Sequence, residues 1–173
     1  IARDRMRNNL PRNLQHALSV FESLRLYGMN YVIDPNSSYI ELSKNATAID
    51  FLQYPAESLM YRGGDCDDLS ILYCSLLESA GINTAFITIP GHIYMAFDTG
   101  LTEKEAREQF FDPGLLIFRD DGVWAPIEVT MVRDGFVKAW RVGAKQWVDN
   151  QRTGFADFFP MQENWKVYPP SAL

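Results

Sequence analysis

The chain has 173 residues, of which 47% are hydrophobic and 13% aromatic, so it can bury the core of one globular domain and disorder is excluded. Its formal net charge of -6 repels phosphate backbones, which excludes nucleic acid as a partner. No apolar run approaches the ~20 residues that cross a bilayer, so we expect no membrane insertion.

The two ends of the chain indicate a piece of a longer protein. It begins at Ile1 and ends in WKVYPPSAL, where the pair Pro169–Pro170 is typical of a linker. We therefore expect residues 1–173 to form a single domain, with other domains of the same longer chain as partners.

Helices are expected in the first part of the chain. Residues 11–27 place apolar side chains at three- and four-residue steps, and Gly28 ends this helix. Residues 31–49 are rich in turn formers and predict a turn between short extended pieces. A short helix from Pro55 to about Tyr61 follows, and the pair Gly63–Gly64 ends it.

The most strongly patterned helix covers residues 65–80. Its apolar side chains share one face: Leu69, Leu72, Tyr73, Leu76, Leu77 and Ala80. Gly81 supplies a left-handed residue at its end. Residues 83–89 and 92–98 then read as strands rich in β-branched and aromatic side chains, and Pro90–Gly91 between them predicts a hairpin.

The remaining elements complete the pattern. Thr102 and Glu105 form a capping box for a short surface helix. Residues 115–132 predict a second hairpin with its turn at Asp121–Gly122, and residues 136–147 predict a closing helix, after which the sequence is aromatic but irregular. Helices, then antiparallel strands, then a closing helix are typical of an α+β fold rather than a parallel α/β sheet.

Cys66 lies where the central helix begins, between two aspartates in YRGGDCDD. With Asp65 as the N-cap, Cys66 takes the first helical position, where free backbone N–H groups and the helix dipole favour a thiolate. The same N–H groups can stabilise an oxyanion when the sulfur attacks a carbonyl carbon. We expect Gly63 and Gly64 to keep the approach free of side chains. Cys66 is thus the candidate nucleophile, whereas Cys74 is equally well explained as core.

A catalytic thiol needs a base that can later protonate a leaving amine, and the pKa of imidazole suits both roles. Of the two histidines, His16 lies among polar neighbours on the first helix, whereas His92 begins the strand expected beside the central helix. His92 is the candidate base. Glu128, a lone carboxylate in the neighbouring apolar strand, can orient its ring. Asp98 would lie too far along the strand, and Asp112 is better explained as a turn residue.

Three stretches, GGDCDDLSILYCSLLESAGI, GHIYMAF and WAPIEVT, resemble the transglutaminase-like superfamily of papain-like cysteine enzymes. In that family a Gly-x-Cys-x-Asp signature opens the core helix, a histidine begins a later strand, and an aspartate after a tryptophan completes a triad. The resemblance covers about residues 53–130 and implies the triad Cys66, His92 and Glu128. Trp124 stands for the tryptophan. Glutamate replaces the usual aspartate, which places the carboxylate one methylene farther from the backbone.

The resemblance implies a papain-like core, with the cysteine helix packed on an antiparallel sheet, and acyl transfer on a protein or peptide substrate through a thioester. Water as acceptor gives a peptidase or amidase, which we favour, whereas a primary amine gives a transglutaminase. The alternative is a catalytically weak or inactive binding or scaffold module of the same fold, because acids beside Cys66 oppose thiolate formation.

No cofactor is required by this chemistry. In some bacterial relatives, however, carboxylates that flank the nucleophile hold calcium. Asp65, Asp67 and Asp68 are therefore a candidate calcium site by resemblance, and otherwise serve as an N-cap and first-turn acids that complement the helix dipole.

Overall fold

The computed structural model describes residues 10–33 and 52–169. Its helices are α1 (Arg12–Tyr27), α3 (Pro55–Tyr61), α4 (Cys66–Ser79), α5 (Glu103–Gln109), α6 (Phe136–Gln151) and α7 (Met161–Val167), with 3-10 helices η2 (Pro113–Leu115) and η3 (Val129–Asp134). Its strands are β1 (Asn30–Tyr31), β2 (Gly63–Gly64), β3 (Thr84–Ile89), β4 (His92–Asp98), β5 (Ile117–Arg119), β6 (Gly122–Ile127) and β7 (Asp157–Pro160). The turn predicted within residues 31–49 and the linker residue Pro170 lie outside the described residues.

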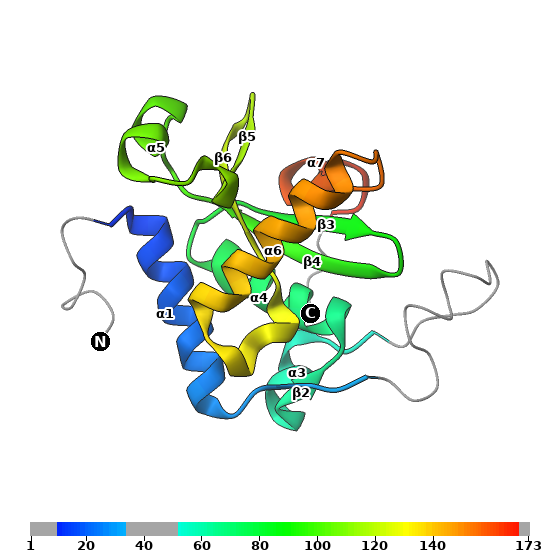
Figure 1. The fold of residues 1–173 in the computed structure, drawn as a ribbon. Coiled ribbons are helices and arrows are strands. Elements are labelled where there is room, and N and C mark those ends of the chain that lie inside the picture. Colours follow the sequence, from blue (N-terminus) through cyan, green and yellow to red (C-terminus); the bar gives the residue numbers. More distant parts are fainter. Residues whose placement is uncertain (1–9, 34–51, 170–173) are drawn as a thin grey trace.

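Five strands form one antiparallel sheet in the order β5-β6-β4-β3-β7. The hairpin predicted at Pro90–Gly91 is confirmed, with Ile89 opposite His92 where β3 turns into β4. In Figure 1, α6 crosses in front of this sheet, α1 lies to its left, and α3 with β2 lies below. The α+β class is confirmed, with the cysteine helix packed on an antiparallel sheet.

The alternation of side chains along β4 divides the core into two clusters. Met95 and Phe97 join the larger cluster, together with residues of α1, α4 and α6. Tyr94 and Ala96 point to the opposite face and join a smaller cluster that contains Trp124 of β6. Both faces of the central strand are thus covered, which fixes its position and that of its first residue, His92.

Three helices are fastened to one another around the larger cluster. The Tyr73 hydroxyl of α4 donates a hydrogen bond to the Ala17 carbonyl of α1, and the rings of Phe21 and Tyr73 meet edge to face at 5.8 Å. The Glu22 carboxylate of α1 accepts a hydrogen bond from the Phe136 N–H at 2.9 Å, which satisfies the first N–H of α6. α4, which carries the cysteine, is therefore held against α1, and α1 in turn is held against α6.

The end of α3 differs from the prediction. Arg62, in the left-handed conformation with φ 56°, ends the helix. Gly63 and Gly64 form β2 instead, which pairs in parallel with β1. A Cβ on Gly64 would lie 2.6 Å from the Cβ of Asp68, and a Cβ on Gly63 would lie 3.0 Å from a methyl group of Val32. The two glycines therefore permit close packing beside α4.

The C-terminal region contains two elements that the sequence did not reveal. β7 pairs with β3, with Ala85 opposite Pro160, and α7 follows it directly. The burial of β7 alternates between exposed and half-buried, but its sequence, DFFP, places two phenylalanines side by side and so lacks the apolar–polar alternation that identifies a strand. The turn between β5 and β6 also lies one residue earlier than predicted, because Arg119 pairs with Gly122. No helix among the described residues is both long and apolar enough to span a membrane.

Candidate active site

Cys66 is the first residue of α4 and Asp65 is the N-cap, as the sequence predicts. Cys66 is buried, with 4% of its surface exposed. Asp68 holds the start of the helix: its carboxylate accepts hydrogen bonds from the Asp65 N–H at 3.3 Å and from the backbone and side-chain N–H groups of Gln53 at 2.7 and 2.6 Å. The position of the sulfur is therefore fixed by a network that reaches the segment before α3.

His92, the first residue of β4, directly contacts one of its predicted partners and lies near the other. Its Nε2 is 2.6 Å from the Glu128 Oε2, and Cys66 is close enough to the imidazole to raise its pKa. Burial lowers the pKa of the imidazole, but the hydrogen bonds and charges of Cys66 and Glu128 outweigh burial and raise this pKa to about 9. The ring of Tyr94 stacks on that of His92, with centroids 5.9 Å apart, and supports its face.

Glu128 lies between the end of β6 and the start of η3 and is 2% exposed. Its Oε1 accepts hydrogen bonds from the N–H and hydroxyl of Thr130 at 3.1 and 2.6 Å, so both carboxylate oxygens have partners. Burial raises the pKa of Glu128, but the hydrogen bond and charge of His92 and the Thr130 donors outweigh it, and the pKa is lowered. The carboxylate is thus buried and charged.

The structure brings Cys66, His92 and Glu128 together from α4, from β4 and from the β6–η3 junction. A thiol beside an imidazole that is paired with a buried carboxylate can form a thiolate–imidazolium pair. The His92–Glu128 contact is one that a triad requires, and the catalytic roles of the three residues stay a prediction.

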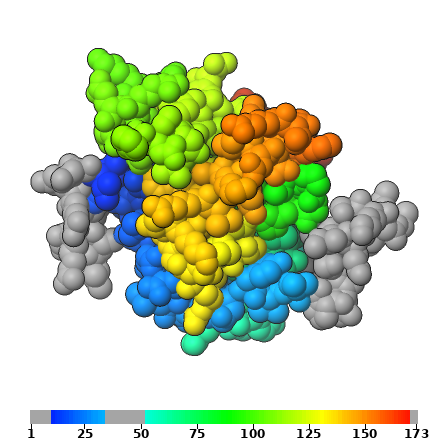
Figure 2. Space-filling view, viewed as in Figure 1, coloured from blue at the N-terminus to red at the C-terminus, as the bar shows by residue number. Residues whose placement is uncertain are grey.

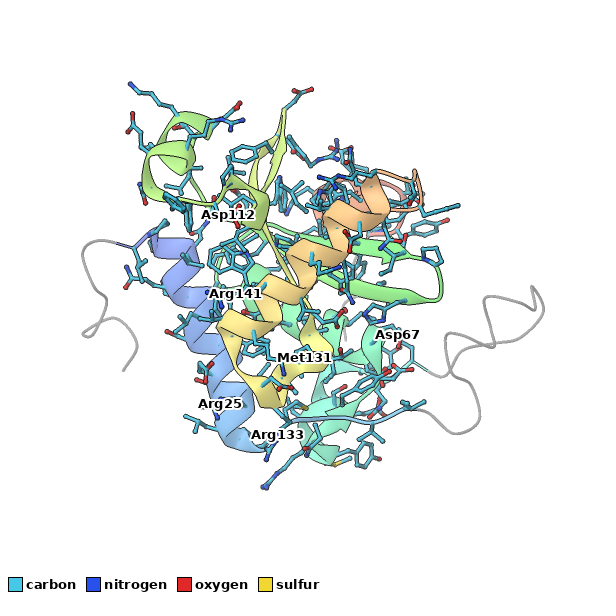
Figure 3. All side chains as sticks on the ribbon, in the orientation of Figure 1. Arg25, Asp67, Asp112, Met131, Arg133 and Arg141 are labelled. Atoms are coloured by element: carbon cyan, nitrogen blue, oxygen red, sulfur yellow. The ribbon has the colours of Figure 1, made fainter. Side chains whose placement is uncertain are left out.

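Two acids flank the thiol. The ligand atoms of Asp65, Cys66 and Asp67 all lie within 4.8 Å of one another. Asp67 is 9% exposed, and its Oδ1 has no hydrogen-bond partner among the described residues. Burial, followed by the hydrogen bond and charge of Asp65, raises the pKa of Asp67 to about 7. Figure 3 shows Asp67 at the start of α4, below β4 in this view.

The donor set fits a hard cation only in part. Carboxylate oxygens are suitable ligands for calcium, and the unpartnered Oδ1 of Asp67 supplies one, whereas the sulfur of Cys66 is a soft ligand. Asp68 is already engaged by the Asp65 and Gln53 donors. The candidate calcium ligands are therefore Asp65 and Asp67, without Asp68.

The other residues considered from the sequence have structural surroundings. The Asp98 carboxylate accepts from the Gly100 N–H at the far end of β4, and Asp112 caps η2. Trp124 packs edge to face on Phe158 at 5.2 Å in the smaller core cluster. Cys74 is buried, and burial raises its pKa to about 12, so it is an inert core residue. His16 is half-buried on α1 and lines a surface groove with residues of α3 and α4.

Thr130 and Tyr94 support the site and were not anticipated from the sequence. Thr130 lies two residues after Glu128, a spacing at which a hydroxyl can bond back to a carboxylate. Tyr94 lies two residues after His92 in a strand, so both side chains share one face. Once Glu128 and His92 had been named as candidates, this two-residue spacing could have identified Thr130 and Tyr94 as their neighbours.

No protein-family model matches the sequence, and no curated protein matches it. The chain is similar in fold to Legionella pneumophila LapG. The calcium-bound structure of LapG is 14% identical, with a TM-score of 0.30 over 70% of this chain and 82% of that chain. A second LapG structure is 17% identical, with a TM-score of 0.31 over 75% of this chain and 78% of that chain. This likeness is distant, so the chemistry of the site rests on its own residues.

Proposed function

We propose that this domain is a cysteine-dependent acyl-transfer enzyme of the transglutaminase-like superfamily that hydrolyses peptide or amide bonds. The observation that carries the proposal is the single chain of contacts from Cys66 through His92 to the buried, charged Glu128. Cys66 is the nucleophile, His92 transfers the proton, and Glu128 holds the imidazole ring in position.

The reaction follows from these roles. The Cys66 thiolate attacks the carbonyl carbon, a C–S bond forms, and the electron pair of the C=O bond moves to oxygen. When this intermediate collapses, the C–N bond breaks and protonated His92 gives its proton to the departing nitrogen, which leaves a thioester on Cys66. His92 then takes a proton from water as the water attacks the thioester, and the carboxylic acid is released.

The identity of the second acceptor separates two activities of the same site. Water gives a peptidase or amidase, and the amine of a protein lysine gives a transglutaminase. Incubation of the protein with a protein mixture and a fluorescent primary amine distinguishes them. New protein N-termini that are absent with Cys66→Ala support hydrolysis, and labelled proteins that are absent with this variant support transfer.

We also propose that the carboxylates of Asp65 and Asp67 are ligands of a structural calcium ion. The ion would compensate two buried carboxyl groups and thereby weaken their opposition to the neighbouring thiolate. The unpartnered Oδ1 of Asp67 supports this assignment.

Alkylation by iodoacetamide as a function of pH tests the proposed thiolate–imidazolium pair. We expect a labelling midpoint for Cys66 well below the value of about 8.5 for free cysteine. His92→Ala should raise the midpoint towards that value because the proton acceptor is lost, and Glu128→Gln should raise it by less. Cys74 is buried and should not react.

His16→Ala is the matched control, because the chain has two histidines and this one lies on α1. It should leave the labelling midpoint unchanged. If the midpoint of the unmodified protein is no lower than that of free cysteine, the enzyme proposal is wrong and the binding or scaffold module is favoured.

A further inference from the structure

Tyr31 lies one strand away from the segment that leads into Cys66. β1 pairs in parallel with β2, with Tyr31 opposite Gly64, and the Val32 N–H donates to the Gly64 carbonyl at 2.9 Å. Because Gly64 precedes Cys66 by two residues, this ladder fixes Tyr31 beside the N-terminus of α4.

The other side of β1 meets the opposite end of the triad. β1 packs against η3, which begins directly after Glu128. Figure 2 shows this contact as the light-blue segment of β1 against the yellow segment of η3. Tyr31 therefore lies between the helix that carries the thiol and the segment that carries the acid.

The phenol of Tyr31 lies within electrostatic reach of the charged groups of the site. Burial raises its pKa, and so do the negative charges of four groups around the thiol: Cys66, Asp65, Glu128 and Asp67. The hydroxyl is therefore protonated at neutral pH and remains a hydrogen-bond donor. It has no hydrogen-bond partner within residues 10–33 and 52–169. The residue is 41% exposed, so an incoming substrate can reach it.

Other polar side chains near the thiol already have acceptors or are inaccessible. The Gln53 amide donates to Asp68 at 2.6 Å, and the Thr130 hydroxyl donates to Glu128 at 2.6 Å. Tyr94 is fully buried behind the His92 ring. Of these hydroxyl and amide donors, that of Tyr31 alone is both unpartnered and accessible.

Acyl transfer needs donors at the point where the carbonyl oxygen becomes negative. The N–H of Cys66 can be one, because the first N–H groups of a helix have no carbonyl one turn earlier to bond. A single donor leaves half of this requirement unmet, since such sites commonly combine two.

We propose that Tyr31 is a catalytic residue whose hydroxyl donates the second hydrogen bond to the oxyanion that forms when Cys66 attacks a carbonyl carbon. This inference rests on the acyl-transfer function proposed above. As the C–S bond forms, the carbonyl electron pair moves to oxygen, and that oxygen accepts hydrogen bonds from the Tyr31 O–H and the Cys66 N–H. When the C=O bond re-forms, the leaving group departs with the electron pair. The proton of Tyr31 stays on Tyr31 throughout.

Two probes of the same sulfur distinguish this role from a structural one. p-Nitrophenyl acetate acylates a thiol through an oxyanion and releases p-nitrophenolate, whereas iodoacetamide alkylates it at a saturated carbon and forms no oxyanion. We expect Tyr31→Phe to slow the p-nitrophenolate burst by about 10²- to 10³-fold and to leave the rate and pH midpoint of alkylation unchanged. Tyr61→Phe, at an exposed tyrosine of α3, is the matched control and should change neither rate.

The outcomes separate the two proposals. If the unmodified protein gives a burst that Cys66→Ala abolishes, and Tyr31→Phe gives the same burst, the role of Tyr31 is wrong and the acyl-transfer function stands. If Tyr31→Phe slows acylation and alkylation equally, Tyr31 positions the thiol and is not an oxyanion donor. If the unmodified protein gives no burst at all, the proposed function fails, and the role of Tyr31 fails with it.

Discussion

Glu128 is the residue at which the sequence departs from the pattern it resembles, and its surroundings accommodate the longer side chain. The Oε1 is held by the Thr130 N–H and hydroxyl at 3.1 and 2.6 Å, which directs the Oε2 to His92 at 2.6 Å. Thr130 thus restrains a side chain that has one more rotatable bond than aspartate. Two donors and one imidazole also keep the carboxylate charged despite its burial.

Asp67 is the residue at which calcium can be tested. We expect calcium to raise the Tm of the unmodified protein, because a ligand that binds the folded state alone stabilises it by mass action. Asp67→Asn should remove most of this increase, and a chelator should reverse it. The measurement is a thermal scan with and without calcium, and Asp121→Asn, at an exposed acid, is the control. Equal shifts in Tm for Asp67→Asn and the unmodified protein would exclude Asp67 as a ligand.

At the scale of elements, α6 determines where the acid of the site lies. β5 pairs only with Gly122–Trp124 of β6. After Trp124, the backbone of β6 and of the residues that follow lies against α6. The Glu128 N–H donates to the Ala139 carbonyl at 3.1 Å. A Cβ on Gly143 would lie 2.8 Å from the Pro126 carbonyl oxygen and 2.9 Å from the Glu128 nitrogen. The absence of a side chain at Gly143 therefore lets the helix touch the strand next to the acid.

Gly143→Ala tests this contact. Alanine favours a helix by about 1 kcal/mol over glycine, but here its Cβ would collide with backbone atoms that cannot rotate away. We expect a net loss of about 1–3 kcal/mol in the free energy of unfolding, measured by urea denaturation, and a slower acylation of Cys66. Lys145→Ala, at an exposed position of α6, should change neither quantity. A gain in stability for Gly143→Ala would show that α6 can shift without strain.

At the scale of the whole molecule, the free energy of unfolding should depend on pH through the charged groups of the site. The pKa of His92 is about 9 in the folded protein and about 6.5 in the unfolded chain. The contribution of His92 to the free energy of unfolding is therefore complete below about pH 6.5 and is lost as the pH rises to about 9. The raised pKa of Asp67 stabilises the folded protein at low pH, and this contribution to the free energy of unfolding is lost as the pH rises from about 4 to 7. The lowered pKa of Glu128 has the opposite sign, and its contribution is lost as the pH falls below about 4.

Between about pH 6.5 and 8.5 the thiolate–imidazolium pair binds as many protons as the unfolded thiol and imidazole, so the free energy of unfolding of the unmodified protein should change little there. In Cys66→Ala no thiol titrates at this position, and Glu128 still raises the pKa of His92, so the free energy of unfolding should fall as the pH rises from about 6.5 towards 9. Adding His92→Gln to Cys66→Ala should flatten this decline. Urea denaturation at a series of pH values measures both variants, and a decline of the same size in the double variant would show that His92 does not cause it.

Local patterns were sufficient for the elements that carry the triad. The face of α4, the cap at Asp65 and the hairpin before His92 each follow from residues that are close in sequence, because helix periodicity, capping and turn geometry are local properties. β2, β7 and α7 were missed because they are short and owe their conformation to partners distant in the chain: β2 to β1, and β7 to β3.

The sequence by itself determined the α+β class and named Cys66, His92 and Glu128 as residues to look for, since residue type and local spacing are enough for that. Only the tertiary structure decided that these side chains meet, that Asp68 holds the helix rather than an ion, and that Tyr31 lies beside the thiol. The reason is physical: a contact between distant residues depends on register and packing, and a shift of one residue in a strand would turn each side chain to the other face.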